Sequence, residues 1–179
     1  VNDDSAVGAM EAYRAAGLPE ERLLCVSFGL EGRAGKDLME RGGPFRASVA
    51  MFPEVVGLIC IKAALCAYHG CRLADRTFSP YAIVTPDNLH VYYHRTENGD
   101  GWEINWARGR QLLHANPSVD ILTQCHRPRL PSRIGYVQIF SSHEWYQNVQ
   151  QAMHRQAEAL GIAFEVVDAS QDWAQEVAK

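Results

Sequence analysis

Apolar positions recur along the chain with two spacings, which predict helices and strands in alternation. Helical spacing is found at residues 4–17, 35–43, 53–69, 102–115 and 144–160, and a further helix is expected from Ser170. Short apolar or alternating runs predict strands at residues 22–28, 45–51, 81–85, 89–95, 133–140 and 162–168. Because strands alternate with helices, the pattern predicts an α/β fold with parallel strands.

Several predicted helices carry residues typical of helix ends. Asp4 or Ser5 suits the N-cap of the first helix, and Gly17 suits the position just after it. Pro53 fits the first turn of the long apolar helix, and Gly161 follows the helix that begins near residue 144. The apolar helix is too short to span a bilayer, so we expect it to be buried.

Residues 116–132 differ from the rest of the chain in composition. They hold three prolines and show no apolar periodicity, which is typical of a linker. The predicted organisation is therefore a first unit over 1–115, a linker over 116–132 and a second unit over 133–179.

Charge and cysteine content narrow the class of protein. The 179 residues carry a net charge of −4 without a long basic run, so we expect neither nucleic-acid binding nor direct membrane insertion. The five cysteines cannot all pair with one another. This favours a reducing compartment and is also compatible with an extracytoplasmic one. The start of the chain shows no signal-peptide pattern, and both ends are abrupt, so we expect a fragment of a longer polypeptide.

Three motifs in the first half occur in a fixed order. An Asn2-Asp3 pair precedes a helix of small residues, "GLEG" (29–32) follows the next strand, and "MFPEVVG" (51–57) leads from a strand into a helix. This series resembles the C-terminal lobe of type I periplasmic solute-binding proteins of the ribose-binding class. Residues 133–179 resemble the N-terminal start of the same fold.

The order of the two pieces is the reverse of the family's order. We interpret the chain as the end of one solute-binding unit followed by the start of a second, in a tandem protein; circular permutation is the alternative. The first unit's sheet would then lack strands and expose apolar surface. Such a chain would hold parts of two sites and would not bind sugar tightly by itself.

The resemblance implies binding of a sugar or polyol for an ABC importer, by hinge closure of two lobes and without catalysis or cofactor. The implied partners are the importer's membrane subunits, and the implied location is periplasmic or extracytoplasmic. Similar motifs occur in sugar-responsive repressors, so a cytoplasmic regulator or sensor is the alternative. An enzyme would require a catalytic constellation, and we find no nucleophile elbow, phosphate-binding glycine loop or H-E-x-x-H motif.

In the first unit, the resemblance implies three ligand-binding positions. Asn2 and Glu31 match positions that bind sugar hydroxyls, although Glu31 is one methylene longer than the usual Asp. Met51 stands where some sugar binders carry a polar residue, which weakens the expectation of a polar contact there. From the residues alone, Asn2 is also a capping residue and Glu31 a solvated turn residue.

In the second unit, the candidates lie where a strand turns into a helix. Sugars present apolar ring faces surrounded by hydroxyls, so their sites need flat aromatics and polar groups. The resemblance implies that Trp145 and Tyr146 stack on the sugar and that His143 binds a hydroxyl. The alternatives are that Trp145 belongs to the core and that His143 is a polar residue at the helix start.

The sequence gives only a weak indication of a metal site, and we predict none. His90 and His94 would share a face of the predicted strand 89–95, but no third ligand lies near them.

Overall fold

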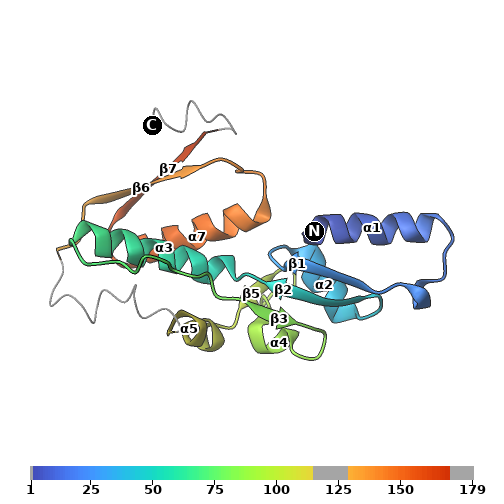
Figure 1. Cartoon of the computed structure of the whole chain (residues 1–179). Coiled ribbons are helices and arrows are strands. Elements are labelled where there is room, and N and C mark those ends of the chain that lie inside the picture. Colours follow the sequence, from blue (N-terminus) through green and yellow to red (C-terminus); the bar gives the residue numbers. More distant parts are fainter. Residues whose placement is uncertain (1, 115–128, 170–179) are drawn as a thin grey trace. The chain divides into compact units, whose positions relative to one another are not determined.

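The structure is a computed structural model that describes residues 2–114 and 129–169, and the chain divides into two compact units. One unit comprises Val1–Phe52 and Ser79–Leu112, and the other comprises Pro53–Phe78 and Leu113–Lys179. The chain therefore passes between the units three times, after residues 52, 78 and 112. Helices and small sheets make up a mixed α/β architecture (Figure 1).

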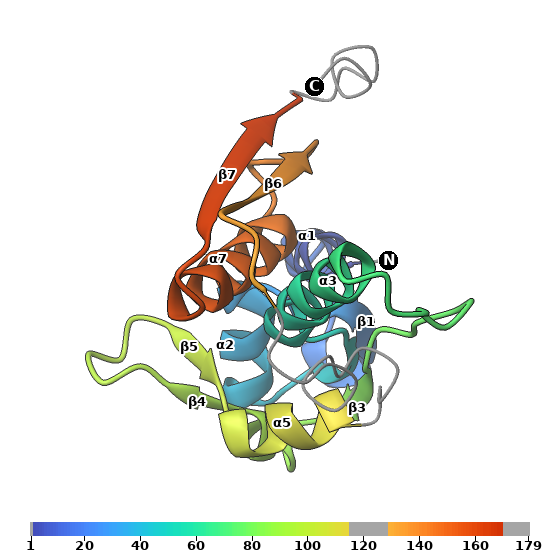
Figure 2. The same ribbon diagram turned by 90° about the vertical axis from the view of Figure 1, so that its left-hand side faces the viewer.

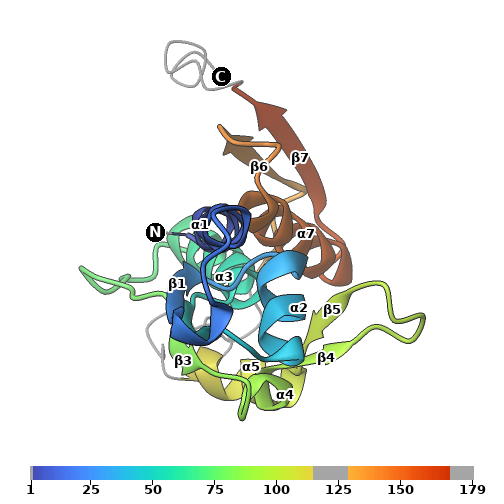
Figure 3. The same ribbon diagram turned by 90° about the vertical axis from the view of Figure 1, so that its right-hand side faces the viewer.

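The first unit is built on a three-stranded sheet with the order β1-β2-β3. Its strands are β1 (Cys25–Gly29), β2 (Phe45–Ala50) and β3 (Ala82–Val84). β2 runs parallel to β1, as the sequence predicts, whereas β3 is antiparallel to β2. The helices α1 (Asp3–Ala15) and α2 (Arg33–Arg41) pack against each other and against the sheet (Figure 3).

The opposite face of this sheet is apolar and exposed. Phe28, Val49 and Ile83 are in register across the three strands and so lie on one face. Phe28 is 48% exposed and Ile83 is 64% exposed. The strands therefore leave apolar surface bare, as expected above.

The remaining elements of the first unit correct two predictions. They are the 3-10 turn Glu20–Arg22, α4 (Leu89–Tyr92), β4 (Tyr93–Arg95), β5 (Trp102–Ile104) and α5 (Trp106–His114). The predicted strand 89–95 is wrong in its first half, because a turn that begins at Thr85 leads into a short helix. The backbone N–H groups of Asn88 and Leu89 both donate to the carbonyl oxygen of Thr85, and the Asn88 side chain accepts from the Thr85 N–H. The predicted helix 102–115 begins only at Trp106, because residues 102–104 pair antiparallel with β4.

The second unit combines two helices with a pair of parallel strands. Its elements are α3 (Pro53–Tyr68), β6 (Arg133–Gln138), α7 (Glu144–Ala159) and β7 (Ala163–Asp168). β6 and β7 lie side by side (Figure 2) and are parallel, which confirms the expected pairing. Residues of α3 and α7 form a buried core with Ile162, and side chains of both strands pack against it.

The long apolar helix α3 groups with α7, which follows it by some 80 residues in the sequence. A Cβ atom on Gly57 would lie 2.6 Å from the carbonyl oxygen of Val149 and 2.7 Å from Cβ of Ala152. The two helix backbones can approach this closely because position 57 has no side chain. The tandem organisation stays a prediction; most of the 116–132 linker and the helix from Ser170 lie outside the described residues.

The helix-end predictions are largely confirmed. Gly17 and Gly161 follow α1 and α7 with φ values of 68° and 71°, and Pro53 is the first residue of α3. The N-cap of α1 is Asn2 rather than Asp4 or Ser5.

Candidate functional site

The three candidate residues of the first unit lie around Phe28 and Gly29, at the carboxyl end of β1. Asn2 forms an isolated parallel bridge with Phe28. The backbone N–H of Met51 donates to the carbonyl oxygen of Gly29 at 3.0 Å. The Glu31 side chain folds back over Gly29, so that a Cβ atom there would lie 2.6 Å from Cδ of Glu31. Residues far apart in the sequence thus share one edge of the sheet, where ligands of α/β proteins bind.

The turn between β1 and α2 holds Glu31 in a buried position. Gly29 and Leu30 have φ values of 126° and 50°, so the chain reverses sharply after the strand. Glu31 is only 7% exposed. It is therefore not the solvated turn residue of the alternative interpretation.

Lys36 ties this turn to the first turn of α2. Its ammonium group donates to the carbonyl oxygens of Glu31 and Gly32, at 3.0 and 3.4 Å, and lies 4.4 Å from the ring centre of Tyr93. Lys36 is only 3% exposed, so these contacts form with little competition from water.

Asp3, which the sequence analysis names only as part of the Asn2-Asp3 pair, is a buried carboxylate. Its Oδ1 accepts from the hydroxyls of Ser27 and Ser48, and the two hydroxyl oxygens lie 2.8 Å apart. Burial raises the pKa of Asp3 above its ordinary value, although both serines, the charge of Lys36 and a backbone bond from Leu30 oppose the shift. The available signal was one serine in each of two neighbouring strands, Ser27 and Ser48, which are in register with each other.

Glycine at position 35 makes room for this carboxylate. A Cβ atom there would lie 3.0 Å from Oδ2 of Asp3 and 3.1 Å from its Cγ. Gly35 in α2 and Gly29 in β1 therefore each allow a carboxylate to approach the backbone closely. Together they place Asp3 and Glu31 within the same small unit.

Asn2 acts as the N-cap of α1. Its Oδ1 accepts from the backbone N–H of Ser5 at 3.2 Å and from the Ser5 hydroxyl at 2.8 Å. The capping interpretation is thus confirmed, and a ligand contact through the amide group stays a prediction.

In the second unit, His143 is the N-cap of α7. Its Nδ1 accepts from the backbone N–H of Trp145 at 3.2 Å. Because a backbone N–H can only donate, Nδ1 carries no hydrogen in this arrangement. A polar residue at the helix start is the alternative given above, and the structure confirms it.

The two aromatic candidates lie beside this cap. Trp145 packs against the buried core of α3 and α7, as the core interpretation expects. Tyr146 contacts the rings of Phe140, His143 and Trp145, with centroids 5.4, 5.9 and 5.0 Å away. The structure brings His143, Trp145 and Tyr146 together at one strand-to-helix turn, and stacking on a sugar stays a prediction.

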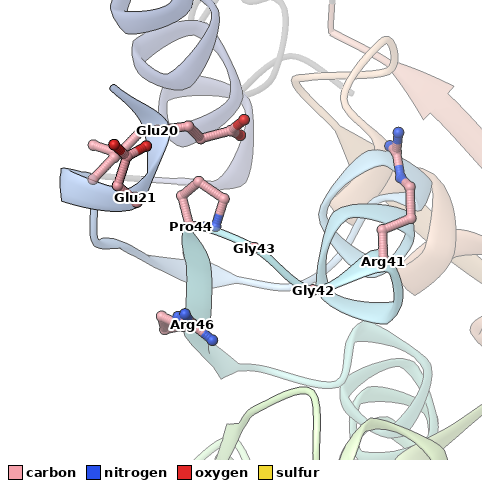
Figure 4. Close-up of a pocket in the computed structure, with 8 residues that line it drawn as sticks. Glu20, Glu21, Arg41, Gly42, Gly43, Pro44 and Arg46 are labelled. Carbon is pink, nitrogen blue, oxygen red and sulfur yellow. The ribbon is translucent and has the colours of Figure 1, made fainter. Parts of the chain in front are cut away.

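A separate cavity of about 360 Å³ lies at the opposite end of the first unit's sheet. Glu20 and Glu21 lie on one side of the Gly42–Pro44 segment and Arg41 lies on the other (Figure 4). Arg46 and Leu23, near the amino ends of β2 and β1, also line it. The cavity is thus distinct from the Gly29 edge, and its carboxylates and guanidinium groups offset each other in charge.

His90 and His94 are not arranged as the sequence predicts. His90 lies in α4 and His94 in β4, so the prediction that they share a face of one strand is wrong. His90 pairs with Glu40 at 3.6 Å and His94 with Glu103 at 3.7 Å. Among residues 2–114 and 129–169, no group of three or more His, Cys, Asp or Glu side chains is arranged to hold a metal ion. Nor does any helix in these ranges have the length and apolar character needed to cross a membrane.

The chain matches no protein-family model and no curated protein.

Proposed function

We propose that this chain forms part of a solute-binding protein that takes up a sugar or polyol for an ABC importer. The observation that carries the proposal is that Asn2, Glu31 and Met51 adjoin Phe28 and Gly29. The backbones of Asn2 and Met51 adjoin Phe28 and Gly29 at the carboxyl end of β1, and the Glu31 carboxylate lies against Gly29 itself. Amide and carboxylate groups are the types that bind hydroxyls by paired hydrogen bonds.

We propose that each intact binding unit closes its two lobes around the ligand by a hinge motion, in which a few residues between the lobes absorb the change in backbone angles. We propose that binding involves no covalent step.

His143, Trp145 and Tyr146 would serve a second site of the same kind. Two aromatic rings and a polar ring at the start of a helix offer stacking surface and a hydrogen-bonding group. Under this proposal the two candidate groups belong to successive binding units of a tandem protein.

The test is calorimetric titration of sugars and polyols into the product of the full open reading frame that encodes this chain. We expect saturable binding, and Glu31→Gln should weaken it at least about tenfold, because a charge-assisted hydrogen bond contributes about 1.5–3 kcal/mol. Glu21→Gln is the matched control, since Glu21 is exposed and lines the separate cavity.

Absence of binding to any sugar or polyol would contradict the importer proposal. The cytoplasmic regulator would then be tested next, by DNA binding of the same full-length product. Equal affinities of the wild type and Glu31→Gln would retain a binding protein and reject the Gly29 edge as its site.

A further inference from the structure

The end of α3 brings two cysteines together. Three backbone bonds close this end: His69 N–H to Leu65, Gly70 N–H to Ala67, and Cys71 N–H to Cys66, at 3.1, 3.0 and 2.9 Å. Gly70 has a φ of 67°. The Cys71 N–H bonds to the carbonyl oxygen of Cys66, five residues earlier, and the residue before Cys71 is a left-handed glycine. This arrangement is a Schellman motif, and its outer hydrogen bond joins Cys66 and Cys71.

This geometry meets the distance requirement for a disulfide. A carbonyl oxygen lies about 2.4 Å from its own Cα and an amide nitrogen about 1.5 Å, so the 2.9 Å bond keeps the two Cα atoms within about 6.8 Å of each other. Disulfides span Cα separations of roughly 4.4–6.8 Å.

The side chains also lie on the same side of the motif. Residues at these two positions of a Schellman motif commonly contact each other. Cys66 belongs to the buried core of the second unit, and Cys71 packs against that core. Both residues are in the thiol form.

We propose that Cys66 and Cys71 form a disulfide that closes the carboxyl end of α3, and that this pair is a redox modification site. The Cys71 thiolate attacks a small-molecule disulfide and releases one thiolate, leaving a mixed disulfide. The Cys66 thiolate then attacks the sulfur of Cys71 and releases the second. Two protein thiols are oxidised, one external disulfide is reduced to two thiols, and the two protein protons pass to the released thiolates or to solvent.

The other described cysteines are poor partners for this pair. Cys60 precedes Cys66 by six residues in the same helix, which separates their Cα atoms by about 9 Å along the axis. Cys60 is exposed whereas Cys66 is buried, so they point in different directions. Cys25 lies in β1 of the first unit, with its Sγ 4.0 Å from the carbonyl oxygen of Ala6 in α1. The order of reaction follows exposure: Cys71 is partly exposed and meets the oxidant, while the buried Cys66 resolves the mixed disulfide.

The test is oxidation of the folded protein by glutathione disulfide, followed by alkylation and peptide mapping without reduction. Cleavage after Tyr68 separates the two cysteines into different peptides, so their linkage is directly visible. We expect a Cys66–Cys71 linkage as the main product and a rise in Tm of roughly 5 °C. Cys60→Ser should leave both results unchanged, and Cys71→Ser should abolish both.

Two outcomes would overturn the proposal. One is full alkylation of Cys66 and Cys71 after oxidation; the other is their linkage mainly to other cysteines. Oxidation in concentrated urea is a further control, because the native motif is lost there and the preference for this pair should fall. Formation of this disulfide does not depend on the proposed sugar binding, because only residues at the end of α3 take part in it.

Discussion

The carboxylate of Glu31 occupies the space in which a Cβ atom on Gly29 would lie. Such an atom would be 2.6 Å from Cδ and 2.9 Å from Oε1 of Glu31. Gly29 also has a φ of 126°, which side-chain-bearing residues rarely adopt. The candidate site thus depends on a missing side chain as much as on the polar groups around it.

Replacement of Gly29 by alanine should therefore be strongly destabilising. Gly29→Ala adds a clash with a buried carboxylate to an unfavourable backbone angle, so we expect a loss of about 3 kcal/mol in the free energy of unfolding. Urea denaturation measures it. Gly8→Ala is the control: nothing lies within 4 Å of a Cβ atom there, and alanine in the exposed middle of α1 should gain about 0.5–1 kcal/mol. A loss for Gly29→Ala no greater than about 1 kcal/mol would contradict the positive φ of Gly29, which by itself predicts a cost of order 1–3 kcal/mol.

Asp3 should make stability decrease as the pH rises. Its pKa is raised in the folded state above the ordinary value of 3.8, mainly by burial. Below that pH both states hold the proton. As the pH rises further the unfolded chain ionises first, so the unfolding free energy falls until the folded carboxyl also ionises.

Asp3→Asn should remove this dependence. The amide keeps an oxygen that can accept from Ser27 but has no charge to bury. In urea unfolding from pH 3.5 to 8, the free energy of unfolding of the variant should increase relative to that of the wild type as the pH rises. Asp4 lies in the same turn but is exposed, so the stability of Asp4→Asn should show the same pH dependence as that of the wild type. A constant difference between Asp3→Asn and the wild type would reject the raised pKa.

Gly57 should be intolerant of even a methyl group. Gly57→Ala would place a Cβ atom 2.6 Å from a backbone oxygen of α7, which must move to accommodate it. We expect a loss of about 2 kcal/mol from overpacking, despite the better helix propensity of alanine. Thermal or urea unfolding measures the loss. A gain like that expected for Gly8→Ala would show that α3 and α7 are not in close contact.

The cap on α7 should depend on the imidazole of His143. His143→Ala removes the acceptor for the Trp145 N–H and should cost about 1 kcal/mol. His143→Ser offers a hydroxyl oxygen in its place and should recover most of the loss. Unfolding curves of the two variants make the comparison; equal losses would assign His143 a role other than capping.

Local sequence patterns predicted the elements whose structure is decided locally. Pro53, Gly17 and Gly161 mark helix ends through their own backbone restrictions, and each lies where expected. Two elements whose structure depends on neighbouring segments were mistaken. Residues 102–104 are a strand because they pair with β4, and residues 89–92 are helical because they continue the turn formed at Thr85 and Asn88.

The candidate site was predictable in part for the same reason. Asn2, Glu31 and Met51 come from motifs, and the sheet brings them together. The burial of Asp3 could not be predicted, because its partners Ser27 and Ser48 lie on strands 24 and 45 residues away. The packing of α3 against α7 could not be predicted either, because the sequence of an apolar helix does not show which surface covers it.

The three passages of the chain have a consequence for its response to a protease. A single cut after Phe78 would give two pieces, and each piece would contribute to both units. The β2–β3 pairing would hold the pieces together in the first unit, and the α3–α7 core would hold them in the second. The two pieces of a nicked molecule should therefore elute together in size-exclusion chromatography until the protein is denatured, because two independent sets of contacts join them.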